Sequence, residues 1–154
     1  STIAMPWQVY MVPQFLMMRK MGLNDTLLAM VVLQAFSAFG VFLMRQFYMG
    51  IPDSLCEAAR IDGMSEFNIY SRIMLPLSKP ALATLTIFTF VATWNDYLGP
   101  TIYLKSESKK TIQIGLQRFI GQYSSEYGLI MAGSVISLIP VLIMFLLLQK
   151  SVLP

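Results

Sequence analysis

The sequence has no histidine, a single cysteine (Cys56) and few charged residues. With so few possible ligands, the chain cannot form an internal disulfide or a His/Cys metal site. It also lacks the Gly-x-x-x-x-Gly-Lys-Ser/Thr pattern of P-loops, so any nucleotide must be handled by another chain. A net charge of +3 over 154 residues is too small to favour nucleic acid as a partner. We therefore expect no catalytic residue, no metal and no cofactor here.

Hydrophobic residues dominate the composition. They make up 56% of the chain against 12% charged residues, and the mean hydropathy is +0.62. A soluble domain carries about a quarter charged residues. Uncharged runs of roughly twenty residues are long enough to cross a bilayer. The sequence thus predicts an all-α, polytopic bundle of transmembrane helices, a single domain with spans at about 1–18, 26–47, 80–98 and 129–148.

The boundaries of the first two predicted spans carry local signals. Pro6 and Pro13 interrupt the first span, and Gly22 is suited to end it in a left-handed conformation. Asn24 or Asp25 can cap the helix that follows. Lys and Arg are shared almost equally between the two sides, five against six, so the positive-inside rule does not decide the orientation. Because the chain opens directly in a hydrophobic run, we expect a fragment of a longer protein.

A polar segment, residues 50–79, separates the second and third spans, and a second one, residues 99–128, follows the third. Within 50–79, Ser54 and Glu57 have the spacing of a capping box. They predict a helix over Leu55–Asp62, and Gly63 supplies a left-handed stop. Such a helix is too short and too polar to cross a bilayer, so it should lie outside the membrane.

A second short helix is expected to begin at Ser65. It should end at Leu75, because the residue before a proline avoids the α conformation. Local physics alone leaves two interpretations open for the pair of helices. They form a docking site for another protein, or they are simply a well-formed connecting loop.

The spacing of a few residues in this segment is more specific. The segment contains the tripeptide Glu57-Ala58-Ala59, and Gly63 follows six residues after Glu57. Ile73 lies ten residues after Gly63 and is followed by Leu75-Pro76. This spacing resembles the EAA loop of ABC importer permeases. Further segments are similar to the maltose-type carbohydrate permeases, specifically to the smaller of their two permease subunits: Phe47–Pro52, Ala59–Gly63, Leu75–Ala83, Thr93–Asp96 and Gly128–Gly133.

The resemblance implies a function. The chain would be the C-terminal part of a sugar permease in a bacterial or archaeal cytoplasmic membrane, and not itself an enzyme. The segment 50–79 would be cytoplasmic and 99–128 extracytoplasmic. Its partners would be a dimeric ATP-binding subunit, a second permease subunit, a solute-binding protein and the lipid bilayer, with no nucleic acid. A coupling helix would contact the ATP-binding subunit through Glu57, Ala58, Ala59, Arg60, Asp62 and Gly63.

Candidates for the substrate path come from the chemistry of sugars. Sugars are neutral and rich in hydroxyls, so their sites combine aromatic faces with amide and carboxylate groups. Polar groups within spans are costly and tend to face the interior of the bundle. The candidates are Gln34, Trp94, Asn95 and Asp96, with Trp7, Gln8 and Tyr10 in the first span. Two other interpretations stay open: the aromatics belong to an interfacial belt, and Asn95 and Asp96 only cap a helix end.

Other cargoes and one other class of protein remain as alternatives. A phosphate-bearing cargo such as glycerol phosphate would favour a basic residue inside a span, and the sequence has none there. A polyamine would favour intramembrane acids, for which Asp96 is the sole candidate. A channel or structural membrane protein without an ATPase would leave the spacing of Glu57, Gly63, Ile73 and Pro76 to coincidence.

Overall fold

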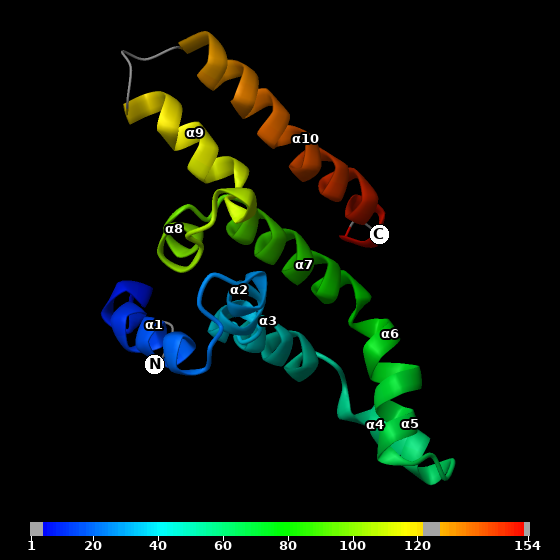
Figure 1. Ribbon diagram of the computed structural model, residues 1–154. Coiled ribbons are helices and arrows are strands. Elements are labelled where there is room, and N and C mark those ends of the chain that lie inside the picture. The colour runs from blue at the N-terminus through cyan, green and yellow to red at the C-terminus, as the bar shows by residue number, and fades with distance from the viewer. Residues whose placement is uncertain (1–4, 122–126, 153–154) are drawn as a thin grey trace. The chain divides into compact units, whose positions relative to one another are not determined.

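The computed structural model describes residues 5–121 and 127–152, and the regular structure of these residues is entirely helical (Figure 1). The all-α fold class is therefore confirmed. Short 3₁₀ turns cover Trp7–Val9 and Glu107–Lys109, and a π-helical turn covers Tyr70–Met74. The α-helices are α1 (Met11–Lys20), α2 (Leu27–Gln34), α3 (Ala38–Met49), α4 (Asp53–Ile61), α5 (Glu66–Ile69), α6 (Leu75–Leu77), α7 (Lys79–Trp94), α8 (Leu98–Tyr103), α9 (Ile112–Gly121) and α10 (Tyr127–Val152).

Among the described residues, two stretches are long and apolar enough to cross a membrane, Leu27–Met49 and Tyr127–Lys150. They correspond to the predicted spans 26–47 and 129–148. A third candidate span is present only if Glu66–Leu77 and Lys79–Trp94, which meet at an angle of 67°, count as one span. In the predicted span 1–18 the described helix is α1, with ten residues. The assignment of four spans stays a prediction.

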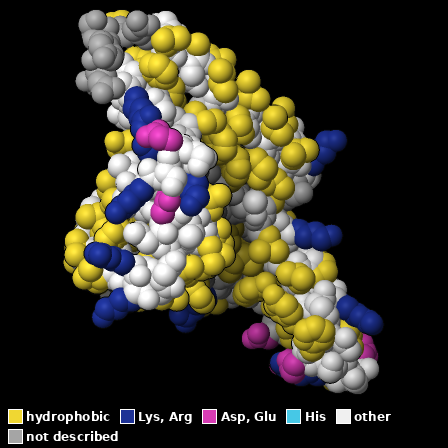
Figure 2. Space-filling model, in the orientation of Figure 1, with side chains coloured by type: hydrophobic (Ala, Val, Ile, Leu, Met, Phe, Trp, Pro, Cys, Tyr) yellow, Lys and Arg dark blue, Asp and Glu magenta, His cyan; other side chains and the backbone are white. Residues whose placement is uncertain are grey.

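The chain divides into two compact units. The first consists of Ser1–Ser37 with Phe90–Ile143, and the second of Ala38–Thr89 with Met144–Pro154. Large apolar side chains are exposed in both units, and in α10 only 6% of the most apolar window is buried. Figure 2 shows hydrophobic side chains covering the visible face of this helix. A helix that is hydrophobic all round belongs in lipid or against other subunits.

The core of the first unit is small. Met18 of α1, Ala29 of α2 and Tyr103 of α8 are buried together. The ring of Phe15 packs on that of Tyr103 with 5.9 Å between centroids. The helix α1 ends in the predicted manner, since Gly22 after its last turn is left-handed, with φ +70°. The backbone N–H of Leu23 donates to Met18 O at 3.0 Å and closes a Schellman motif.

The start of α2 corrects a prediction. The N-cap is Thr26, whose hydroxyl oxygen accepts from Ala29 N at 3.3 Å. Neither Asn24 nor Asp25 fills this position. Asp25 adopts φ +58° and turns its carboxylate to the segment after α8, so the next residue along the chain has the extended backbone that an N-cap needs.

In the second unit, the chain from α5 to α7 departs from the predicted helix end at Pro76. The helix continues through this residue, because a π turn precedes it. Leu75 N donates to Tyr70 O, five residues back, and Pro76 then stands in the first turn of α6, where no amide donor is required. Ser78 ends the segment, fully buried, with its hydroxyl donating to Leu75 O at 2.9 Å.

Candidate functional site

The helix α4 begins two residues earlier than the sequence predicts. Its N-cap is Pro52, with φ −62° and ψ 132°, and no side chain caps it. The predicted capping box at Ser54 is therefore wrong. The extended backbone of Pro52 starts the first turn, in which Leu55 N donates to Pro52 O at 3.2 Å. Ser54 already lies inside the helix, where a capping geometry is impossible. The carboxylate of Asp53 lies in the first turn, where its negative charge interacts favourably with the positive end of the helix dipole.

The end of α4 confirms the predicted role of Gly63. This residue has φ +79°, a conformation that a side chain disfavours. Gly63 N donates to Arg60 O and Met64 N donates to Ala59 O, both at 3.0 Å. These two bonds form a Schellman motif, which satisfies carbonyls that would otherwise lack partners. The short helix is thereby fixed at its exit.

The two faces of α4 differ sharply. Ala59 is only 4% exposed, and Cys56 Sγ lies 3.7 Å from Met74 Sδ in the π turn. Opposite them the helix is open: Ile61 is 86% exposed. The candidate coupling residues are therefore exposed except for Ala59, namely Glu57, Ala58, Arg60, Asp62 and Gly63. Charged side chains gather over α4 and α5 in Figure 2.

An ion pair joins α4 to α5. Arg60 Nε lies 2.7 Å from Glu66 Oε1, and its Nη2 donates to Oε2 at 3.3 Å. The hydrogen bond from Arg60 lowers the pKa of Glu66, and the same bond raises the pKa of Arg60. The pair is exposed, so it contributes little to stability. It orients the guanidinium along the surface of α4 and α5.

Three of the substrate-path candidates, Gln34, Asp96 and Trp7, lie together in the first unit. Gln34 and Asp96 line a cavity of about 190 Å³, whose other walls are Trp7, Met30, Leu33, Gly99 and Tyr103. Gln34 Oε1 accepts from Thr93 Oγ1 at 2.5 Å. Asp96 Oδ1 accepts from Gly99 N at 3.1 Å, a bond to the first turn of α8 and not to the end of α7, where the sequence offered Asp96 as a cap.

The other candidates lie elsewhere. Trp94 stacks on Phe90 and donates its indole N–H to Ser137 O at 3.0 Å, which joins α7 to α10. Asn95 Oδ1 accepts from Gln113 Nε2 of α9 at 3.4 Å. Tyr10 is 38% exposed and does not line the cavity. That any of these residues contacts substrate stays a prediction.

Known proteins resemble the chain along nearly its whole length. Residues 2–153 match the family described as "Binding-protein-dependent transport system inner membrane component". The chain belongs to this family. Membership places it in the inner membrane and among the components of binding-protein-dependent transport systems.

Individual relatives of this inner membrane component differ in cargo. An arabinooligosaccharides transport system permease protein from Halalkalibacterium halodurans is 36% identical, over 96% of this chain and 53% of the relative. A lactose transport system permease protein from Rhizobium radiobacter is 34% identical, over 97% and 55%. An sn-glycerol-3-phosphate transport system permease protein from Shigella flexneri is also 34% identical, over 97% and 54%. The chain spans about half the length of these relatives.

A solved structure agrees with the fold of this inner membrane component. It is a crystal structure of a bacterial ABC transporter involved in the import of the acidic polysaccharide alginate. The match has a TM-score of 0.77 at 33% identity, and it covers 90% of this chain and 55% of the solved chain.

Part of the site was missed by sequence reasoning. Gly99 closes the cavity next to Asp96, and a Cβ there would collide with Asp96 Oδ2. The Asp-x-x-Gly spacing is a signal that could have indicated this close approach. Tyr103, Met30 and Leu33 gave no such signal, because an apolar or aromatic residue in a membrane protein most simply packs or faces lipid.

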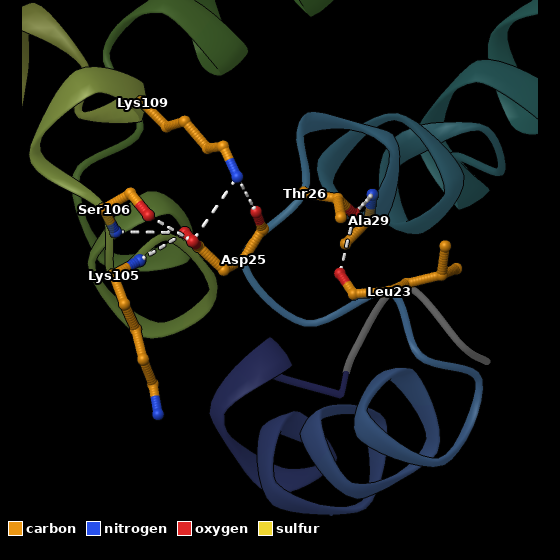
Figure 3. A network of polar contacts seen from close by, with 7 residues as sticks. All are labelled: Leu23, Asp25, Thr26, Ala29, Lys105, Ser106 and Lys109. Carbon is orange, nitrogen blue, oxygen red and sulfur yellow. Dashed lines mark hydrogen bonds and ion pairs between the residues drawn. The ribbon is translucent and has the colours of Figure 1, made fainter.

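A polar network outside the cavity was also missed. The turn before α2 and the segment after α8 meet at Asp25 (Figure 3). Its carboxylate accepts from the backbone N–H groups of Lys105, at 2.8 Å, and Ser106, at 3.0 Å, and from the Ser106 hydroxyl. Lys109 Nζ reaches both the Asp25 carboxylate and its backbone carbonyl. These hydrogen bonds, those from Ser106 first, hold the pKa of Asp25 well below its usual range.

Proposed function

We propose that this chain forms part of the permease subunit of an ABC importer for a sugar, and that α4 is the helix through which ATP hydrolysis on a separate subunit drives transport. The chain has no nucleotide-binding motif, so the energy of ATP hydrolysis must reach it through a contact with the ATP-binding subunit. Its partners are a dimeric cytoplasmic ATP-binding subunit, a second permease subunit and an extracytoplasmic solute-binding protein. The segment 50–79 faces the cytoplasm.

The observation that carries the proposal is the exposed face of α4. The Schellman motif at Gly63 fixes the C-terminal end of this helix. Its inner face packs through the buried Ala59 and through Cys56, which contacts Met74. Its outer face presents Glu57, Arg60 and the apolar side chain of Ile61 to solvent. A helix that transmits force must not fray, and an isolated helix of nine residues would do so.

The route of the force is continuous along the chain. From α4 it runs through α5 and the π turn into α6 and α7 (Figure 1). The hydroxyl of Tyr48 in α3 donates to Ser78 Oγ at 3.3 Å, at the bend between α6 and α7. A displacement of α4 would therefore move two longer helices of its own unit.

Sugar is the favoured cargo. Two of the relatives above are named for saccharides, and one for glycerol 3-phosphate. The cavity residues favour the first class, because Asp96 is the only charged side chain among the described residues that line the cavity. A carboxylate repels a phosphate cargo. A polyamine with several ammonium groups would need more than one acid.

A photo-crosslinking experiment in the complete importer tests the docking contact. Benzoylphenylalanine replaces Ile61 on α4 in one variant and Phe36 in the other; both side chains are highly exposed, at 86% and 92%. We expect irradiation to join the Ile61 variant to the ATP-binding subunit, and the Phe36 variant to lipid or to the second permease. An Ile61 variant that never captures the ATP-binding subunit would refute the docking role.

A further inference from the structure

We propose that the cavity lined by Trp7, Gln34, Asp96 and Tyr103 is a binding site for one ring of a neutral saccharide. The inference rests on the proposed transport function and adds a site within this subunit. It goes beyond the separate candidacies of Trp7, Gln34 and Asp96, since it joins them to a buried tyrosine that the sequence did not suggest. All the lining residues belong to the first unit of the chain.

The buried hydroxyl of Tyr103 points to a missing partner. The side chain is 1% exposed, and its Oη has no hydrogen-bond partner within the described part of the chain. Buried tyrosine hydroxyls are normally paired, because an unpaired one loses its bonds to water without compensation. Tyr103 lines the cavity, while its Oη has almost no accessible surface in the empty protein. We infer that a small movement of the wall lets a ligand hydroxyl reach Oη and supply the partner.

Other groups around the cavity are only partly used. Gln34 Oε1 accepts from Thr93 Oγ1, a bond that does not involve the two N–H donors of Gln34 Nε2. Asp96 Oδ1 accepts from Gly99 N, and that bond leaves Oδ2 to accept from a ligand. The cavity thus combines amide donors, a carboxylate acceptor and a hydroxyl that both donates and accepts.

Trp7 adds an apolar surface. Its indole N–H already donates to Gln14 Oε1 at 2.8 Å, so the remaining contribution of this side chain is its ring. Aromatic rings bury large apolar areas, and the C–H face of a sugar ring is the complementary surface. With Met30 and Leu33, Trp7 gives the mixture of apolar wall and few polar groups that is typical of small-molecule sites.

Size and charge narrow the ligand class. About 190 Å³ is less than the roughly 300–1,000 Å³ typical of sites for larger ligands, so one sugar ring fits and a whole oligosaccharide does not. The single carboxylate excludes an anionic ring at close range. The N–H donors of Gln34 require ligand lone pairs, which an ammonium group lacks. A neutral ring carrying hydroxyls satisfies all three conditions.

Thiol labelling in the complete importer tests the site. The starting variant is Cys56→Ser, and Leu33→Cys then places one thiol in the cavity wall. Methyl methanethiosulfonate, a small uncharged reagent, reports its accessibility by mass spectrometry. We expect at least one of glucose, galactose and arabinose to slow the labelling about fivefold or more, in a saturable manner. Glycerol 3-phosphate should not slow it.

A matched pair of variants shows whether the hydroxyl of Tyr103 is responsible. Tyr103→Phe removes only this group, and the empty protein should fold as well as before, because the hydroxyl has no hydrogen-bond partner among the described residues. The sugar concentration that gives half-protection should rise by about three- to tenfold, as for the loss of one hydrogen bond. Tyr97→Phe, at a 40% exposed position outside the cavity, should leave it unchanged.

A thiol outside the cavity completes the controls. Met21→Cys, in the turn after α1, is exposed and should label at one rate with or without sugar. The cavity site would be overturned if sugar protected neither thiol, or protected both equally. Protection by glycerol 3-phosphate would also overturn it, as would an unchanged half-protection concentration in Tyr103→Phe. Uptake of a labelled sugar by an importer whose Leu33→Cys thiol is never protected would do the same, while leaving the transport function itself intact.

Discussion

Asp25 shows how one residue can hold two distant segments of this chain together. A left-handed backbone conformation is uncommon for a residue with a side chain, and Asp and Asn tolerate it best. The bonds from Lys105, Ser106 and Lys109 offset this conformational cost. They connect positions about eighty residues apart, next to the helix that supplies Tyr103 to the cavity.

The first prediction concerns the pH dependence of this network. Because the folded protein holds the pKa of Asp25 below its unfolded value of about 4, the carboxylate stabilises the fold above that value. The stabilisation falls progressively as the pH drops below about 4. Asp25→Asn should lower the melting temperature of the purified importer at pH 7 and flatten its decrease at acid pH. Asp62→Asn, at an exposed site in the other unit, should retain the wild-type acid profile. Equal profiles for wild type and Asp25→Asn would contradict the assignment.

Some of these residues could be predicted and others could not, for a physical reason. A glycine in a left-handed helix exit answers a local need, so Gly22 and Gly63 were predicted from their neighbours alone. The role of Asp25 depends on partners far along the chain, and the burial of Tyr103 depends on three helices meeting. Neither leaves a pattern in the local sequence.

At the scale of elements, the ends of α4 and α5 yield a matched comparison. Ser65 caps α5 by accepting from Asn68 N at 3.4 Å, as predicted, whereas Ser54 makes no such bond. Ser65→Ala should therefore cost about 0.5–2 kcal/mol in the free energy of unfolding. Ser54→Ala should change it by less than about 0.5 kcal/mol, since Ala is a good helix former. Thermal or denaturant unfolding of the two variants in one detergent would measure the difference, and a larger loss for Ser54→Ala would restore the capping box.

The bend between α6 and α7 yields another prediction. Tyr48→Phe removes the hydroxyl that donates to the buried Ser78, which costs about 0.5–1.5 kcal/mol for a hydrogen bond of ordinary strength. Tyr70→Phe is the control, at a side chain that is 50% exposed. Unfolding measurements should separate the two variants. If both lose the same stability, the contact between Tyr48 and Ser78 is not what holds α3 to the bend.

Helix ends at this scale were harder to predict than helix positions. Pro76 predicted a stop, yet the π turn before it absorbs the missing donor and lets the helix continue. Pro52 offered an extended backbone that competed successfully with the Ser54 hydroxyl. In both cases a proline's effect depended on which carbonyls its neighbours reached, which the residue types alone do not specify.

At the scale of the whole molecule, composition and one spaced motif carried most of the inference. Long uncharged runs predicted the helical membrane fold, and the spacing from Glu57 to Pro76 predicted the family that the comparisons then showed. The proposed function depends on a partner that the chain must touch. The exposed face of α4 is where this account places the contact.

The central claim is that the exit of α4 sets the docking of the ATP-binding subunit. Gly63 and Gly22 provide a matched pair for testing it. Both lie in Schellman motifs, with φ +79° and +70°, and apart from the two chain neighbours a Cβ on either would meet no atom of the described residues within 4 Å. Valine at either position thus carries the same local strain without a steric clash.

The decisive measurement is the amount of ATP-binding subunit that co-purifies with the permease, normalised to permease in the membrane. We predict that Gly63→Val loses most of this association, and with it the ATPase activity stimulated by loaded binding protein, whereas Gly22→Val retains both. Normal association in Gly63→Val, or an equal loss in the two variants, would contradict the account.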